Sequence, residues 1–316
     1  MLHALILIVA QTTVLLAISP FLVGVIRKVK ARFQLRRGAS VLQPYADLAK
    51  LFQKQPVIST TTSWIFTATP YIVFASILTA GLLVPTFTSQ TPMNFAGNII
   101  ALVYLLALST FFLILAGLDA GSAFGGMGSS REAIVASLTE PAMILAIFAI
   151  ALTNGSTNVS TIVHKTALLE DVVTDPSPHL MALAALFIVA LAETGRVPVD
   201  NPATHLELTM IHEAMVLEYS GRYLALLEWA AGLKLAVFLS LIANVFAPWG
   251  IATTITPAAM AFGLLVYLAK TAALAMLIGV IECMFAKLRL FRVTDLLGVA
   301  FILALLGLLF FYILRS

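Results

Sequence analysis

The sequence predicts an all-α, polytopic membrane protein with about eight transmembrane helices, and three observations indicate this class. The chain of 316 residues is 61% hydrophobic and only 10% charged, whereas soluble domains contain about 25% charged residues. Eight apolar segments approach or exceed the roughly 20 residues that one span requires. The loops between them are too short to fold alone, so the sequence predicts a single integral membrane domain over residues 1–316.

The eight predicted spans lie near residues 2–26, 64–86, 97–117, 132–153, 179–193, 223–246, 255–281 and 296–314. The fifth is short for a full crossing. Alternate loops share one side of the membrane, and loops 27–63, 118–131, 194–222 and 282–295 carry 14 of the 18 Lys and Arg residues. The positive-inside rule predicts these four loops in the cytoplasm and both termini on the non-cytoplasmic side. The first apolar run lacks a basic start, which is typical of a retained span rather than a signal peptide.

The first basic loop contains a predicted amphipathic helix at the membrane surface. Pro44 suits the first turn of a helix. The apolar side then has Tyr45, Leu48, Leu51 and Phe52, and the polar side has Asp47, Lys50 and Lys54. This helix either anchors the chain to lipid or docks a cytoplasmic partner.

The second basic loop, residues 118–131, is rich in glycine and is predicted to be flexible. Neither a GxGxxG nor a GxxxxGK[ST] pattern is present, so a phosphate-binding loop is not indicated. Ser129 followed by Glu132 matches a capping box at the start of the fourth span. Glu132 therefore has both a structural and a functional interpretation.

Glu140 lies inside the fourth span, beside Pro141. An ionised carboxyl at such a depth costs about 3 kcal/mol or more, so its presence suggests a function. Eight residues separate it from Glu132, which is about 12 Å along a helix axis. One or two waters or side chains bridge such a distance.

The longest polar interruption in the second half of the chain runs from Ala192 to Gly221. It contains the acids Glu193, Asp200, Glu207, Glu213 and Glu218, and the histidines His205 and His212. Carboxyls that lie close together raise one another's pKa and share protons near neutral pH, which suits proton relay. The structural alternative for Asp200 and Asn201 is a helix cap before Pro202.

No metal site is predicted in this interruption. His205 and His212 are about 10 Å apart on one helix face, too far to share an ion. The HExxH pattern is absent because residue 216 is Val. The chain has one cysteine, Cys283, which excludes a disulfide framework and a Cys-ligated cluster within it. No serine or cysteine is matched with a histidine base, so no catalytic residue is predicted.

The later spans also carry charges. Lys234 and Lys270 lie well inside predicted spans, where a lysine needs a partner acid or a water path. Glu228 and Glu282 are closer to span ends, and snorkelling is the structural interpretation for both. The sequence thus predicts a proton path that enters from the cytoplasmic face and consists of Glu132, Glu140, Glu193, Asp200, Glu207, Glu213, Glu218, Glu228, Lys234 and Lys270.

Several stretches resemble a known family. The segments RFQLRRGASVLQPYADLAKLF, SREAIVASLTEPAMI, AETGRVPVD and LEYSG are similar to the first membrane subunit of respiratory complex I. They resemble still more closely its counterpart in group 4 NiFe hydrogenases, such as the membrane anchors of formate hydrogenlyase and hydrogenase-4. The segment GLDAGSAFGGMGSSREA is typical of the hydrogenase branch.

This resemblance implies a non-catalytic membrane anchor in an oxidoreductase complex of the inner (cytoplasmic) membrane. Its partners would be the hydrogenase large and small subunits and antiporter-like membrane subunits, beside the lipid bilayer; no nucleic acid is implied. The iron–sulfur clusters and the Ni–Fe centre would belong to those partners, with no cofactor in this chain. The junction with the redox arm would involve Arg36, Arg37, Asp47, Arg131, Arg196 and His205.

Some positions depart from the complex I pattern. Ala203 and His205 replace acids, Ala39 replaces proline, and the third basic loop is about three residues longer. The resemblance therefore favours the hydrogenase branch, which uses no quinone. The alternative is a complex I subunit with a quinone site. A stand-alone transporter is a further alternative, which the absence of an internal repeat disfavours.

Overall fold

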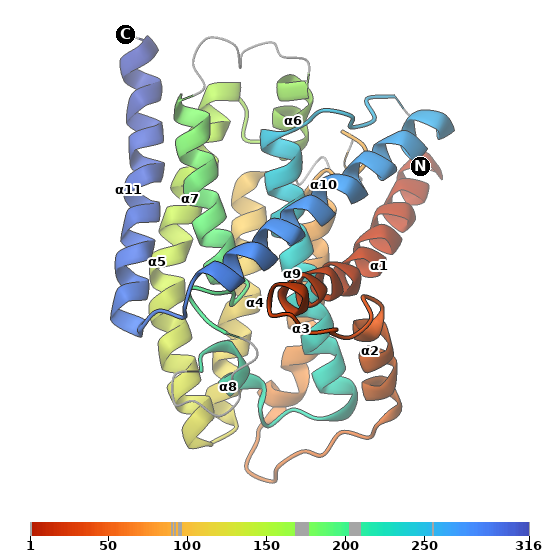
Figure 1. Cartoon of the computed structure of the whole chain (residues 1–316), viewed down its shortest axis with the longest axis vertical. Coiled ribbons are helices and arrows are strands. Elements are labelled where there is room, and N and C mark those ends of the chain that lie inside the picture. Colours follow the sequence, from red (N-terminus) through yellow and green to blue (C-terminus); the bar gives the residue numbers. More distant parts are fainter. Residues whose placement is uncertain are drawn as a thin grey trace.

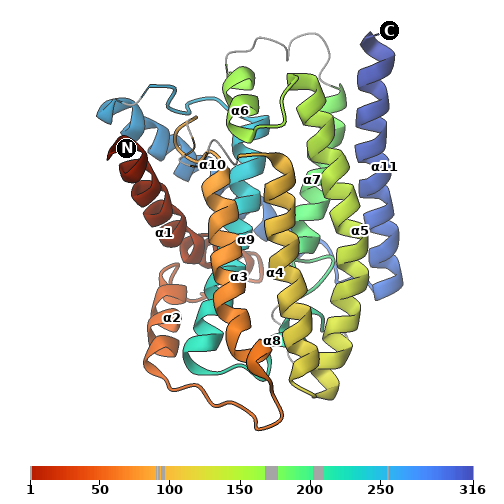
Figure 2. The same cartoon turned by 180° about the vertical axis from the view of Figure 1, so that it is seen from behind.

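The computed structural model describes residues 2–89, 91, 93, 97–167, 177–201, 210–254 and 256–315, which form an all-helical bundle (Figures 1 and 2). The helices are α1 (Leu2–Phe33), α2 (Gln43–Gln53), α3 (Trp64–Leu83), α4 (Ile99–Asp119), α5 (Ala123–Asn154), α6 (Val159–Ala167), α7 (Ser177–Glu193), α8 (His212–Val216), α9 (Gly221–Phe246), α10 (Pro257–Met284) and α11 (Leu290–Arg315). The predicted all-α class is confirmed.

The predicted spans correspond to eight long helices. Within the described residues, α1, α3, α4, α5, α9, α10 and α11 are long and apolar enough to cross a membrane. The eighth, α7, is apolar but has only 17 residues. It extends over about 26 Å, slightly less than the hydrocarbon layer. It packs against α5, α9 and α11, so neighbouring helices cover much of its surface.

Helix α9 forms the centre of the bundle, with α1, α2, α3, α7 and α10 packed against it. All residues from Leu233 to Val245 are buried. A helix that is apolar on every side is stable only inside such a bundle. Lys234 is the one charged residue of this run, so its ammonium group requires a partner from a neighbouring helix.

Helices α2 and α8 lie at one end of the bundle, hereafter the α2/α8 end, and the start of α1 and the end of α11 lie toward the other (Figures 1 and 2). Pro44 is in the first turn of α2, which confirms the predicted short helix. The Phe52 ring packs edge-on against Trp229 of α9, with 6.0 Å between ring centroids. Beyond α2, the Val57 N–H donates to Ser220 Oγ at 2.7 Å, and the Ser220 hydroxyl donates to the Val57 carbonyl at 3.2 Å. The segment after α2 is thus tied to the residue that precedes α9.

The prediction that residues 118–131 form a flexible loop is wrong, because α5 begins at Ala123. Ser122 caps this helix by accepting a hydrogen bond from the Gly125 N–H at 3.1 Å. The glycines are there for close packing. A Cβ at Gly125 would lie 2.4 Å from the Gly117 carbonyl oxygen of α4, and one at Gly128 would lie 2.8 Å from the Ala214 Cβ of α8.

Other differences concern the ends of elements. Helix α1 continues seven residues beyond its predicted span to Phe33, and α11 begins before its predicted start, at Leu290. The predicted loop 154–178 contains the short helix α6. Helix α10 crosses the face of the bundle obliquely (Figure 1). These extensions place basic residues of α1 within reach of α10.

We expect Gly125→Ala to destabilise the protein by about 1–3 kcal/mol, because the new methyl group would collide with backbone atoms that cannot move aside. The neighbouring Gly126→Ala is the matched control. A Cβ there meets nothing within 4 Å, and alanine in a helix interior gains about 0.5–1 kcal/mol over glycine. Melting temperatures of the two purified variants measure the difference. Equal destabilisation by both would contradict the packing argument.

Candidate functional site

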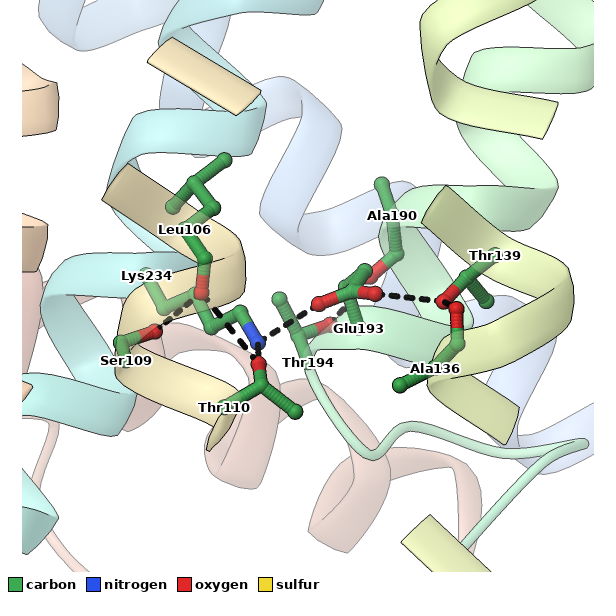
Figure 3. A network of polar contacts seen from close by, with 9 residues as sticks. All are labelled: Leu106, Ser109, Thr110, Ala136, Thr139, Ala190, Glu193, Thr194 and Lys234. Carbon is green, nitrogen blue, oxygen red and sulfur yellow. Dashed lines mark hydrogen bonds and ion pairs between the residues drawn. The ribbon is translucent and has the colours of Figure 1, made fainter. Parts of the chain in front are cut away.

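A buried ion pair joins four helices at the middle of the bundle (Figure 3). Lys234 Nζ of α9 lies 2.7 Å from Glu193 Oε2, at the last residue of α7. The same ammonium group donates to Thr110 Oγ1 of α4 at 3.0 Å. The Thr139 hydroxyl of α5 donates to Glu193 Oε1 at 2.6 Å. Lys234 therefore has the partner acid that its position inside a span requires.

The surroundings of this pair are nearly closed to solvent. The Lys234 and Glu193 side chains are 10% and 5% exposed. Among the described residues, the two charges are satisfied by each other and by the hydroxyls of Thr110 and Thr139. A buried pair of this kind adds little net stability over apolar residues, yet removing one partner costs about 3–5 kcal/mol. A function that needs the charges explains such a pair better than stability does.

A second buried carboxylate is Glu282 of α10. Its side chain is 0% exposed, and it lies between Lys30 Nζ at 2.7 Å and Arg196 Nη1 at 3.3 Å. The expectation that Glu282 snorkels to the surface is wrong, because the basic end of α1 and the segment after α7 supply two cations inside the protein. Arg196, expected at a partner junction, is directed inward to this carboxylate.

A third acid, Asp200, binds the start of α8. Its Oδ2 accepts the backbone N–H groups of Ile211 at 3.2 Å and His212 at 3.0 Å, while Lys287 Nζ lies 2.7 Å from Oδ1. Asp200 therefore caps α8. The sequence also predicts that Asn201 caps a helix starting at residue 202. That helix would be formed by residues 202–209, which lie outside the described residues. Glu207 and His205 belong to those residues.

A cavity of about 790 Å³ lies at the α2/α8 end between α1, α2, α9 and the segment after α7. Its charged and titratable lining consists of Arg27, Lys30, Arg36, Asp47, Arg196, Asp200, His212, Glu213, Glu228 and Glu282. Three acids of the predicted proton path and three residues of the predicted junction are in this set. The cavity thus gathers groups that lie far apart in the sequence into one polar chamber.

Two groups on α8 titrate unusually in this chamber. Burial, reinforced by the carboxylates of Glu228 and Asp200, raises the pKa of Glu213 to about 7. Burial, reinforced by the positive charge of Lys234, lowers the pKa of His212 to about 4. At neutral pH, Glu213 is therefore close to its midpoint and His212 is neutral.

This titration predicts a pH effect for Glu213→Gln. The folded protein keeps the Glu213 proton between its ordinary pKa of 4.5 and about 7, while the unfolded chain has lost it. The contribution of Glu213 to the free energy of unfolding of the wild type therefore falls as the pH rises through that window. We expect the variant to gain roughly 2–4 °C in melting temperature relative to the wild type between about pH 5 and 7.5, which corresponds to about 1 kcal/mol. The exposed Glu218→Gln is the control, and a gain that does not depend on pH would contradict the argument.

The two acids of α5 lie in different surroundings. Glu132 is buried, 8% exposed, and makes no hydrogen bond or ion pair within the described residues. The predicted capping box that explained it is wrong, because Ser129 is inside α5 and its hydroxyl donates to the Ile114 carbonyl at 3.0 Å. Glu140 is half-buried and directly follows Thr139, which contacts Glu193.

The structure does not bring every predicted residue to the ion pair. Lys270 donates to the Ala247 carbonyl, which is about 20 Å along α9 from Lys234. Glu218, just before α9, and Glu228, on α9, are exposed, and Glu228 faces the large cavity. Arg131 donates to the Met210 carbonyl at 3.0 Å.

The first basic loop presents the expected junction side chains at the surface. Arg36 and Arg37 are exposed. Asp47 of α2 accepts from Gln43 at 2.9 Å and lies 3.7 Å from Arg27. This part of the α2/α8 end is therefore available to a partner.

Several residues of the site were absent from the predicted set: Lys30, Thr110, Thr139, His212 and Lys287 as contacts of the acids, and Glu282 as a buried group. One feature of the sequence indicates such a contact: the basic residues that follow the first span, which include Lys30, are close enough to the membrane to pair with a buried acid. Within the described residues no three His, Cys, Asp or Glu side chains are placed to hold a metal ion.

The sequence matches the NADH dehydrogenase protein family over residues 4–313. The chain belongs to this family. Hydrogenase-4 component C of Escherichia coli (strain K12) is 35% identical over 301 residues, which cover 95% of this chain and 94% of that protein. Formate hydrogenlyase subunit 4 of the same organism is 35% identical over 283 residues, with 89% and 90% covered. The predicted resemblance is confirmed.

More distant similarities extend to a complex I subunit and to a solved structure. An NADH-quinone oxidoreductase subunit of Rickettsia peacockii (strain Rustic) is 31% identical over 229 residues, covering 69% of this chain and 65% of that protein. A solved structure of the membrane-bound sulfane sulfur reductase, an archaeal respiratory membrane complex, contains a chain with a TM-score of 0.80 and 22% identity, covering 98% of both chains. This family member is therefore a multi-span membrane protein homologous to subunits of hydrogenase and complex I-type assemblies.

Proposed function

We propose that this chain is the membrane anchor subunit of an energy-converting NiFe hydrogenase complex of the formate hydrogenlyase type. The observation that carries the proposal is the 35% identity with hydrogenase-4 component C and formate hydrogenlyase subunit 4 over nearly the whole chain. The match to the NADH-quinone oxidoreductase subunit is lower, at 31%, and covers 69% of the chain. In this proposal the redox centres belong to partner subunits, and this chain carries out no turnover.

The anchor lies in the cytoplasmic membrane with its α2/α8 end in the cytoplasm. The basic loops gather at that end, which is the orientation that the positive-inside rule favours. Both termini then face the non-cytoplasmic side. Exposed Arg36 and Arg37, with Asp47 on α2, supply the polar surface for the iron–sulfur and large subunits. The antiporter-like subunits contact the lipid-facing helices.

The buried acids conduct protons between that junction and the membrane subunits. The chamber acids Glu213, Glu228 and Asp200 exchange protons with the cytoplasmic side. A proton that reaches Glu193 neutralises the partner of Lys234 and weakens an ion pair of 2.7 Å. The ammonium group then loses its counter-charge, and this change in charge is the step that couples the two sides of the path.

The test is purification of the complex through a tag on this chain. We expect nickel, iron–sulfur subunits and antiporter-like subunits to co-purify, with hydrogen evolution and no quinone reduction. The second candidate function, a complex I subunit with a quinone site, is favoured by the cavity of about 790 Å³. Quinone reduction without hydrogenase activity would reject the first proposal and support the second.

Within this function, we expect Glu140→Gln to lower proton translocation about tenfold or more, because the amide keeps the shape but has no exchangeable acid proton. Assembly and hydrogen evolution should be retained. Quenching of a pH-sensitive dye in inverted membrane vesicles measures translocation. Asp295→Asn, at an exposed acid of α11 outside the path, is the control. Normal translocation in the assembled Glu140→Gln complex would remove Glu140 from the path.

A further inference from the structure

A second, much smaller cavity lies in the interior next to the buried ion pair. Its volume is about 30 Å³, which is room for one or two waters. Its polar lining is formed by Ser109, Thr110, Glu132, His212 and Lys234. Such a lining offers a water the two to four polar partners that it needs, so this cavity is a water site rather than an empty void.

Glu132 is a group that a water in this cavity would satisfy. Its residue is 8% exposed, and its carboxyl has no hydrogen-bond partner within the described residues. A buried polar group without a partner costs about 1–3 kcal/mol. Because Glu132 lines the small cavity, a water there is the partner that removes this cost.

Two residues, His212 and Ala231, line both the small cavity and the cavity of about 790 Å³. They therefore form the wall between the solvent-side chamber and the interior. The rest of the small cavity is closed by apolar side chains, among them Leu113, Val216 and Leu227. Ala231 has no proton to exchange, which leaves His212 as the titratable residue that lines both cavities.

The position of His212 is fixed by its backbone rather than by its ring. Its N–H donates to Asp200 Oδ2 at 3.0 Å, at the first residue of α8. The imidazole makes no hydrogen bond or ion pair with any described residue. A ring held only through its backbone is able to present one nitrogen to each cavity. Because its lowered pKa keeps the ring neutral near pH 7, one nitrogen remains a free acceptor.

We propose that His212 is the proton-transfer residue in the wall between the two cavities, and that it delivers protons through the small-cavity water to Glu132. The inference rests on the proposed function and names the first step of its proton path. One ring nitrogen accepts a proton from a water or carboxyl of the large cavity, and the other gives its own proton to the small-cavity water. That water passes a proton to the Glu132 carboxylate. The ring is again neutral, but its proton is now on the other nitrogen. Rotation of the ring returns the protonated nitrogen to the small-cavity side, ready for the next transfer.

The delivered proton lies next to the buried pair. Glu132 and Lys234 line the same small cavity, and Lys234 lies 2.7 Å from Glu193. Neutralising Glu132 removes one negative charge from the vicinity of the ammonium group. The inference therefore connects the chamber to the Lys234–Glu193 pair without any continuous column of water.

The test uses His212→Ala in the intact complex in inverted vesicles, with and without added imidazole. Translocation is measured as membrane potential, because imidazole is a permeant base that would dissipate a pH gradient. The substitution keeps the backbone hydrogen bond to Asp200, and the large cavity has room for an imidazole molecule. We expect proton translocation to fall at least about tenfold while hydrogen evolution is retained, and imidazole to restore most of it. His164→Ala, at an exposed histidine of α6, should translocate normally in either condition.

Two outcomes would overturn the inference: normal translocation in the assembled His212→Ala complex, or a loss that imidazole does not reverse. If His212→Ala fails to assemble, His212→Gln replaces it, since the amide fills the site and cannot exchange the proton; normal translocation there also overturns the inference. Glu193→Gln is measured in parallel. Normal translocation in Glu193→Gln would mean that the proposed proton path fails as a whole, whereas a defect there with normal His212 variants would reject this inference alone.

Discussion

Replacement of Lys234 by Met is expected to lower the free energy of unfolding by about 3–5 kcal/mol and to abolish proton translocation. The methionine fills the same space, but the Glu193 carboxylate, 2.7 Å from the ammonium group in the wild type, is left without a counter-charge. Thr139 alone still donates to it. The melting temperature of the purified complex and dye quenching in vesicles measure the two effects.

The double variant Lys234→Met, Glu193→Gln separates these effects. No charge remains buried in it, so most of the lost stability should return, with a coupling energy of about 1–3 kcal/mol between the two sites. Translocation should remain absent, because the path lacks both members of the pair. If the double variant is no more stable than Lys234→Met alone, the two side chains do not form an ion pair in the protein.

Replacement of Glu282 by Gln is expected to cost about 3 kcal/mol, because it leaves Lys30 and Arg196 facing each other without the carboxylate between them. The end of α1, the segment after α7 and α10 would then separate. The single cysteine reports this opening directly, since Cys283 follows Glu282 and is partly buried. We expect faster labelling of Cys283 by a maleimide in the variant, together with a lower melting temperature.

Asp47→Asn is the matched control for Glu282→Gln. Asp47 also lies near a cation, 3.7 Å from Arg27, but the Arg27 and Asp47 side chains are 56% and 47% exposed. Exposed pairs of this kind contribute less than about 1 kcal/mol. The labelling rate of Cys283 should therefore be unchanged. A loss of stability equal to that of Glu282→Gln would show that exposure does not control the strength of these pairs.

The membrane helices were predictable because the thickness of a bilayer fixes the length of an apolar segment. The loop before the fourth span was not, because glycine serves two opposite purposes. It permits unusual backbone conformations in loops, and it also permits helices to touch. Gly125 and Gly128 have the second purpose, against α4 and α8. Only the tertiary contact distinguishes the two.

The candidate site was predictable in part for a similar reason. A lysine inside a span needs an acid, so the sequence predicts that Lys234 has one; that the acid is Glu193 follows from the packing of α7 on α9. Thr110 and Thr139 could not be predicted, since hydroxyls in apolar helices usually bond to their own backbone carbonyls. The burial of Glu282 could not be predicted, because its cations, Lys30 and Arg196, come from distant segments of the chain.

The hydrogen bonds between Ser220 and Val57 attach an exposed segment to the central helix of the bundle. Helix α9 begins directly after Ser220, and Lys234 lies about 20 Å further along it. The segment after α2 is therefore joined to the same helix that carries the ammonium group deep in the bundle. The exposed segment at the α2/α8 end and the central charge are thus connected through a single helix.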